Sequence, residues 1–122
     1  MPSLQESLRQ FLAVEGVRTA VLVDIATGMI IRSVGKTDAD LPTAAACMAD
    51  EARAARTALG TGGSAGDLSE ITTLTASRLQ VSRILATQPG EGLLLFIDFE
   101  RARSNAGLAA LRVDQLAPAV LA

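Results

Sequence analysis

The sequence contains no histidine, tryptophan or tyrosine, and its aromatic residues are three phenylalanines. Without histidine the chain lacks the most common general base, the most common metal ligand and the usual switch at physiological pH. The single cysteine, Cys47, excludes an internal disulfide and a thiolate metal centre. These absences argue against enzymatic or metal chemistry, so we expect no catalytic residue, no cofactor and no bound metal.

The chain also lacks an excess of charge of one sign and a long apolar run. It has 11 basic and 13 acidic side chains, whereas a nucleic-acid binder would gather a basic surplus on one face. The N-terminal segment MPSLQESLRQFL contains Glu6 and is amphipathic, unlike a secretory signal. No stretch approaches the roughly 18 apolar residues of a membrane-spanning helix. We expect a single cytoplasmic domain without membrane insertion.

Hydrophobic periodicity predicts helices over residues 3–13, 41–59 and 104–116, and strands over 17–24, 29–34, 68–75, 78–86 and 92–99. The order α-β-β-α-β-β-β-α predicts an α+β fold with a five-stranded antiparallel sheet flanked by helices. The segment GLLLFIDF is apolar on both faces and should be central, whereas LSEITTLT has the polar faces of an edge strand. The residues expected to face inward are Leu41, Ala45, Met48, Ala52, Ala55 and Leu59 in the long helix, and Leu108, Leu111 and Leu116 in the last one.

Three features invite a chemical interpretation. Asp24, in the stretch DIATGMIIRSVG, and Asp98 both end predicted interior strands, where they could approach each other as an acid–base pair or each accept N–H groups of a turn. The loop GTGGSAGD is rich in glycine, but it lacks the lysine of a phosphate-binding loop and precedes a strand instead of a helix. A G-x-S-x-G nucleophile motif is absent. We interpret both aspartates as structural and the loop as a connector.

The outer face of the long helix is the strongest candidate for a binding surface. Asp50, Arg53 and Thr57 are predicted to point away from its apolar stripe, with Arg56 on the flank. The ordinary interpretation is a solvated face with an ion pair between positions 50 and 53. Small residues complicate that interpretation, because they extend the apolar surface beyond what packing on one sheet needs: Cys47, Ala54 and Ala58.

Three stretches, in this order, resemble the Roadblock domain, the family of the dynein light chain Roadblock and of bacterial small-GTPase regulators. VEGVRTAVLVDIATGMIIRSVG resembles the opening hairpin of that family, the Ala-rich helix ending in LGTGG its long helix, and GLLLFIDFERARSNAGLAALR its closing strand and helix. The chain departs from the family at Ala76-Ser77, where a glycine often separates the third and fourth strands.

The resemblance implies a homodimer, or a heterodimer with a related chain, in which the edge strands pair and the long helices lie side by side. The dimer-interface residues would be Cys47, Ala54, Ala58, Leu68, Glu70, Thr72 and Leu74. It also implies a non-enzymatic scaffold or regulator that binds a Ras-like small GTPase or a signalling complex. From the outward face of the long helix, we expect Asp50, Arg53, Arg56 and Thr57 to face that partner. Two alternatives remain open: a ligand-sensing module, and a structural assembly adaptor without a GTPase partner.

Overall fold

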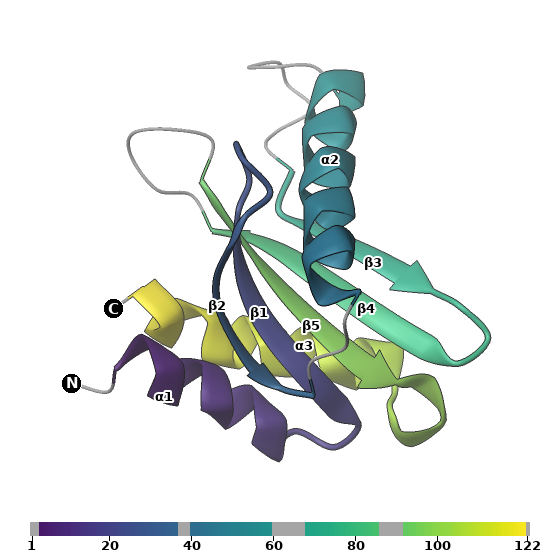
Figure 1. Ribbon diagram of the computed structural model, residues 1–122. Coiled ribbons are helices and arrows are strands. Elements are labelled where there is room, and N and C mark those ends of the chain that lie inside the picture. The colour runs from purple at the N-terminus through teal and green to yellow at the C-terminus, as the bar shows by residue number, and fades with distance from the viewer. Residues whose placement is uncertain (1–2, 37–39, 60–67, 86–91, 122) are drawn as a thin grey trace.

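The computed structural model describes residues 3–36, 40–59, 68–85 and 92–121, and Figure 1 shows their arrangement. The elements are α1 (Leu4–Arg9), β1 (Val17–Asp24), β2 (Ile30–Gly35), α2 (Leu41–Leu59), β3 (Glu70–Leu74), β4 (Arg78–Leu85), β5 (Leu93–Glu100) and α3 (Ala106–Leu116). Short 3-10 segments follow α1, β5 and α3: η1 (Gln10–Ala13), η2 (Arg101–Arg103) and η3 (Ala117–Leu121). The predicted order of elements is confirmed, whereas the GTGGSAGD loop lies outside the described residues.

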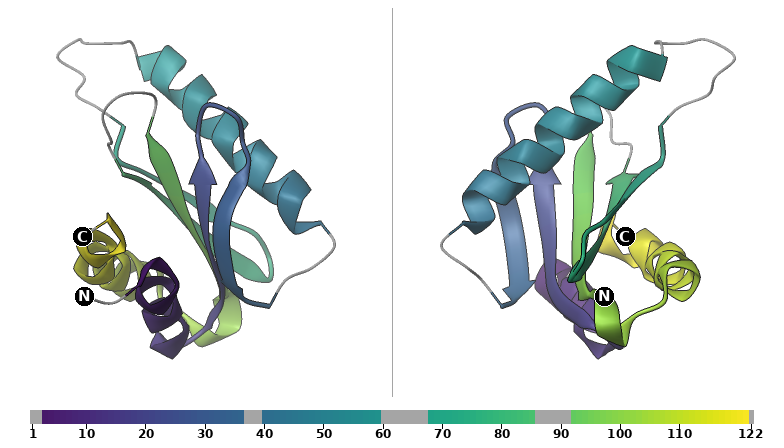
Figure 2. Two further views of the ribbon diagram at one scale, coloured as in Figure 1. Left: turned by 60° about the vertical axis from the view of Figure 1, so that its left-hand side comes forward. Right: turned by 90° about the vertical axis from the view of Figure 1, so that its right-hand side faces the viewer.

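The five strands form one antiparallel sheet in the order β2-β1-β5-β4-β3. The predicted fold class is therefore confirmed, with β5 in the centre and β3 at an edge. Helix α2 covers one face of the sheet, and α1 and α3 cover the other (Figure 2). Both faces of β1 and β5 are thus buried, which explains why most of their residues are apolar.

Alternation along the central strands divides the apolar side chains between two cores. Under α2, the strand residues Val21, Val23, Leu94 and Phe96 pack against three buried alanines, Ala45, Ala49 and Ala52. Under α1 and α3, the core holds Leu8, Phe11, Ala20, Leu22, Leu79, Val81, Leu95, Ile97, Phe99, Ala109 and Val113. Because alanine is small, the backbone of α2 lies close to the sheet.

The predicted inward faces of the helices are partly wrong. Leu59, at the last turn of α2, is 48 % exposed, and Leu108 and Leu111 of α3 are each 51 % exposed. In α3 the smaller residues Ala109 and Val113 face the sheet instead. Helical spacing alone is compatible with either face of α3, and close packing on the sheet selects the face with the smaller side chains.

The ends of the first and last helices are set by side-chain caps. Ser3 and Glu6 form the predicted capping box at α1, and the chain then continues as η1, so that the predicted helix of residues 3–13 has two parts. Helix α3 begins later than predicted, because Asn105 caps it by accepting the N–H of Leu108.

The turn between β3 and β4 forms without the glycine that the resemblance implies. Oγ1 of Thr75 accepts the N–H groups of Ser77 and Arg78, and the guanidinium of Arg101 donates to the carbonyl of Thr75 at 2.7 Å. Within the described residues a positive φ occurs at glycines alone, so this turn does not require one. Hydrogen bonds to the side chain of Thr75 therefore stabilise this turn in a conformation that needs no glycine.

Candidate functional site

Asp24 shapes the turn between β1 and β2. Its Oδ2 atom accepts the N–H of Thr27 at 3.2 Å and the hydroxyl of Thr27 at 2.7 Å, and its backbone bonds to Gly28 and Met29. Oγ1 of Thr27 in turn accepts the N–H of Met29. These hydrogen bonds hold the turn in one conformation, and the carboxylate of Asp24 accepts two of them. This is the structural role predicted for Asp24.

Asp98 has a different environment from the one predicted, because it lies inside β5 and does not end the strand. Its side chain is buried, with Arg78 at 2.5 Å and Arg18 at 3.6 Å from Oδ2. In the β1–β5 register, Asp98 stands opposite Thr19 whereas Asp24 stands opposite Leu93. The two aspartates therefore do not form the acid–base pair that was the alternative to a structural role, since antiparallel pairing separates them along the sheet.

Arg53 connects the β1–β2 turn to α2. Its guanidinium donates to the backbone carbonyls of Ile25 and Ala26 and forms an ion pair with Asp50, one turn earlier in the helix. This confirms the ion pair between positions 50 and 53 that the ordinary interpretation predicted. It also shows that Arg53 reaches back to the hairpin, a contact that helical periodicity does not reveal because its acceptors are backbone atoms.

Gly28 brings the same turn into direct contact with α2. Its φ of 75° lies in the left-handed region, and a Cβ atom at this position would stand 3.2 Å from the Cα of Ala46. Glycine is required here both for the backbone conformation and for the close approach. The turn and the helix therefore form one continuous structural unit.

Most of the residues predicted to lie on the outer face of α2 are exposed. Asp50 and Thr57 are exposed, Arg56 is half-buried, and the small residues Cys47, Ala54 and Ala58 are all exposed. The hydroxyl of Thr57 donates to the carbonyl of Arg53. The helix thus presents an outer strip of small side chains with polar groups at its margin, and a second helix can approach such a strip closely.

The edge strand β3 offers a second open surface on the same molecule. It pairs with β4 along one side, from Glu70 opposite Arg83 to Leu74 opposite Leu79. Leu74 is 52 % exposed and Thr72 is exposed, while Glu70 and the preceding Leu68 are half-buried. No proline interrupts β3, so its outer backbone groups can pair with another strand.

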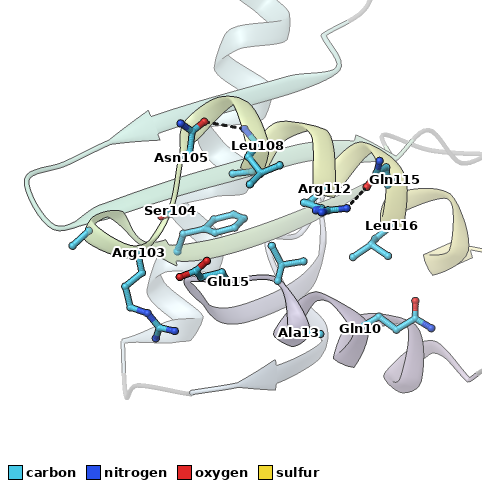
Figure 3. Close-up of a pocket in the computed structure, with 14 residues that line it drawn as sticks. Gln10, Ala13, Glu15, Arg103, Ser104, Asn105, Leu108, Arg112, Gln115 and Leu116 are labelled. Atoms are coloured by element: carbon cyan, nitrogen blue, oxygen red, sulfur yellow. Dashed lines mark hydrogen bonds between the residues drawn. The ribbon is translucent and has the colours of Figure 1, made fainter.

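A groove of about 640 Å³ lies on the opposite layer, between α3 and the segment that follows α1 (Figure 3). Phe99 and Ala109 form its buried floor. The charged groups at its rim, Glu15, Arg103 and Arg112, are exposed, and the guanidinium of Arg112 donates to Gln115. No buried titratable side chain lines this groove, and its charged groups lie at the exposed rim.

Neither a metal site nor a membrane span is found in the part of the chain that the structure describes. No group of three or more potential ligands among histidine, cysteine, aspartate and glutamate side chains is close enough to hold a metal ion there. No helix among the described residues combines the length and the apolar character needed to cross a bilayer. The exposed surfaces of α2, the β1–β2 turn and β3 form the candidate site.

Comparison with known proteins supports the fold. No protein-family model and no curated protein matches the sequence. Among solved structures, an MglB with a tetrameric arrangement is similar at a TM-score of 0.78 and 22 % identity, over 96 % of this chain and 84 % of that chain. The gliding protein MglB of Thermus thermophilus has a TM-score of 0.71 and 21 % identity, over 93 % and 84 %.

A structure described as a Roadblock/LC7 domain, from Streptomyces avermitilis, is similar over 95 % of this chain and 96 % of that chain, with a TM-score of 0.69 and 19 % identity. At these identities the likeness concerns the fold, and it extends over nearly the whole chain. The resemblance stated from the sequence is thereby confirmed at the level of structure: this chain has the Roadblock fold.

Proposed function

We propose that this protein is a non-enzymatic homodimeric scaffold that binds a Ras-like small GTPase and regulates it. The observation that carries the proposal is the pair of open surfaces, the outer strip of α2 and the edge of β3, on a chain with the Roadblock fold. A single copy leaves both surfaces without a partner.

Dimerisation would cover these two surfaces together. Pairing of β3 with its copy joins two five-stranded sheets into one, and it satisfies the outer backbone groups of the edge. The same two-fold axis brings Cys47, Ala54 and Ala58 of α2 toward the second α2, where small side chains permit a close approach. Leu68, Glu70, Thr72 and Leu74 would then lie at the strand junction.

The partner proposal rests on the Roadblock resemblance and on the similarity to structures named MglB. A platform of this kind would order the switch regions of the GTPase without donating a catalytic group, which suits a chain without histidine. The surface beside the dimer seam carries Asp50, Arg56 and Thr57, with Arg53 at its margin. We place this function in the cytoplasm, where Ras-like GTPases act.

The proposal is tested with the purified protein as bait and lysate of the source organism, supplemented with GDP or with a non-hydrolysable GTP analogue. Recovery of a small GTPase in one nucleotide state supports a regulator, and its hydrolysis rate is then measured with and without this protein. Partners recovered equally in both states would instead favour the structural adaptor.

Dimerisation is tested separately by sedimentation equilibrium. Leu74→Asp places a charge at the proposed strand junction and should shift the protein to monomer. Leu111→Asp, at a residue of nearly equal exposure on α3, is the matched control and should leave the dimer intact. A monomeric wild-type protein would contradict the dimer.

A further inference from the structure

We infer that the tip of the β1–β2 hairpin forms part of the GTPase-binding surface, with Met29 as its apolar contact residue and Arg53 as a positioning residue. This inference rests on the proposed function and extends it to residues outside α2. Its starting point is Met29, which is 67 % exposed and the most exposed of the large hydrophobic side chains in the described residues. Ile31, two positions further, is 45 % exposed.

The turn that carries Met29 is rigid. Thr27 accepts the N–H of Met29, Asp24 accepts from Thr27, and the carbonyl of Met29 accepts the N–H of Asp24 at 2.9 Å. Because the backbone of this turn is already ordered, it loses little conformational entropy when the side chain of Met29 binds a partner. The flexible thioether of methionine also adapts to an apolar pocket in a partner.

The hairpin tip is continuous with the outer face of α2. Gly28 packs against the backbone of Ala46, and Arg53 binds the carbonyls of Ile25 and Ala26 while it pairs with Asp50. Figure 1 shows the β1–β2 connection beside the middle of α2. Ala46 and Asp50 are themselves exposed, so a partner that contacts α2 at these residues meets the hairpin next to them.

The area of the helix also indicates that a partner must extend beyond it. Helix α2 has 19 residues, which at 1.5 Å per residue is about 28 Å, so an outer strip about 10 Å wide offers roughly 280 Å². A stable protein interface needs roughly 800 Å² on each partner. The two strips of a dimer together still offer less than this area, and the second α2 covers part of each strip. The hairpin tip is a rigid apolar surface adjacent to α2, and we therefore expect the binding surface to extend from α2 onto it.

Arg53 acts in this arrangement through the hairpin. Its guanidinium is occupied by two backbone carbonyls and by Asp50, and its side chain is 35 % exposed. It therefore holds the turn against α2 and places Met29, and the partner contacts Met29 itself. The consequence is testable, because a positioning effect and a contact effect combine differently in a double mutant.

The experiment measures the affinity of the purified protein for each Ras-like GTPase of the source organism, loaded with GDP or with a non-hydrolysable GTP analogue. We expect Met29→Ala to weaken binding about tenfold and Met29→Asp to abolish it, with unchanged thermal unfolding because the side chain is exposed. Leu111→Ala, at an exposed leucine of α3, is the matched control and should change the affinity less than twofold. If wild-type protein binds and Met29→Asp binds equally well, the inference is wrong and the proposed function stands. If wild-type protein binds none of the GTPases, both are wrong.

The role of Arg53 is tested with Arg53→Met alone and combined with Met29→Ala. We expect the double variant to bind no more weakly than Met29→Ala alone, because the positioned side chain is already absent. Amide hydrogen exchange at Thr27 and Gly28 should also become faster in Arg53→Met. Additive losses of affinity, or unchanged exchange at the turn, would overturn the positioning role.

Discussion

The buried carboxylate of Asp98 gives the sharpest prediction about stability. It lies on the central strand β5 with its side chain 10 % exposed, and two guanidinium groups converge on it. The side chain of Arg18 is 16 % exposed and that of Arg78 is 33 % exposed. Asp98→Asn removes the negative charge but keeps the size of the side chain, so it leaves two partly desolvated cations without their shared counterion.

The expected loss follows from these burials. Removing one member of a fully buried ion pair costs about 3–5 kcal/mol. Here Arg78 is a third exposed and can turn toward water, and Arg18 keeps Glu100 at 4.0 Å, so we reduce the expected loss for Asp98→Asn to about 2–3 kcal/mol. Domains of this size are stable by about 5–15 kcal/mol, so the loss is a large share of the total.

The assay is urea unfolding at one fixed protein concentration, because dimerisation would make the midpoint depend on concentration. The control is Arg103→Ala, which removes an exposed ion pair with Glu100 and should cost less than about 0.5 kcal/mol. A loss below about 1 kcal/mol for Asp98→Asn, or a loss equal to that of the control, would refute the view that this cluster is desolvated.

Two further predictions concern packing and backbone conformation, and the same unfolding assay measures both. Gly35→Ala should cost about 3 kcal/mol, because φ is 92° and a Cβ atom would stand 2.3 Å from the carbonyl oxygen of Arg18, whereas Gly107→Ala at the start of α3 should stabilise by about 0.5 kcal/mol. Val113→Ala should cost about 2 kcal/mol because Val113 is fully buried, and Leu111→Ala less than about 0.5 kcal/mol. An equal effect for the members of either pair would contradict the assigned backbone conformation or the assigned face of α3.

Much of the fold could be predicted from local signals in the sequence. Strand β1 and helix α2 have the predicted bounds, because alternating β-branched residues and a long alanine-rich stripe are strong periodic patterns. The central place of β5 followed from its apolar residues on both faces, and the edge position of β3 from its polar ones. The turn role of Asp24 was also local, since all its acceptor contacts lie within the same hairpin.

Tertiary structure decided the features that depend on residues distant in the sequence. Asp98 resembles Asp24 at the end of an apolar run, yet Arg18 and Arg78 from two neighbouring strands determine its environment. The spacing of Leu108, Leu111, Ala109 and Val113 allowed either face of α3 to turn inward, and close packing against the sheet selected the smaller residues. The sequence indicated the ion pair of Arg53 with Asp50 but not its contacts with the hairpin, because those acceptors are backbone carbonyls 27 and 28 positions away.

The amino-acid sequence by itself therefore determined the order of elements, the sheet and the absence of histidine chemistry, since these depend on residue types and on short-range periodicity. The union of α2 with the β1–β2 hairpin was decided by the tertiary structure alone. It requires a left-handed glycine at position 28, a small residue opposite it in α2 and an arginine that reaches two carbonyls. The sequence offers many possible partners for this glycine, this small residue and this arginine. Only folding determines which of them come within contact distance.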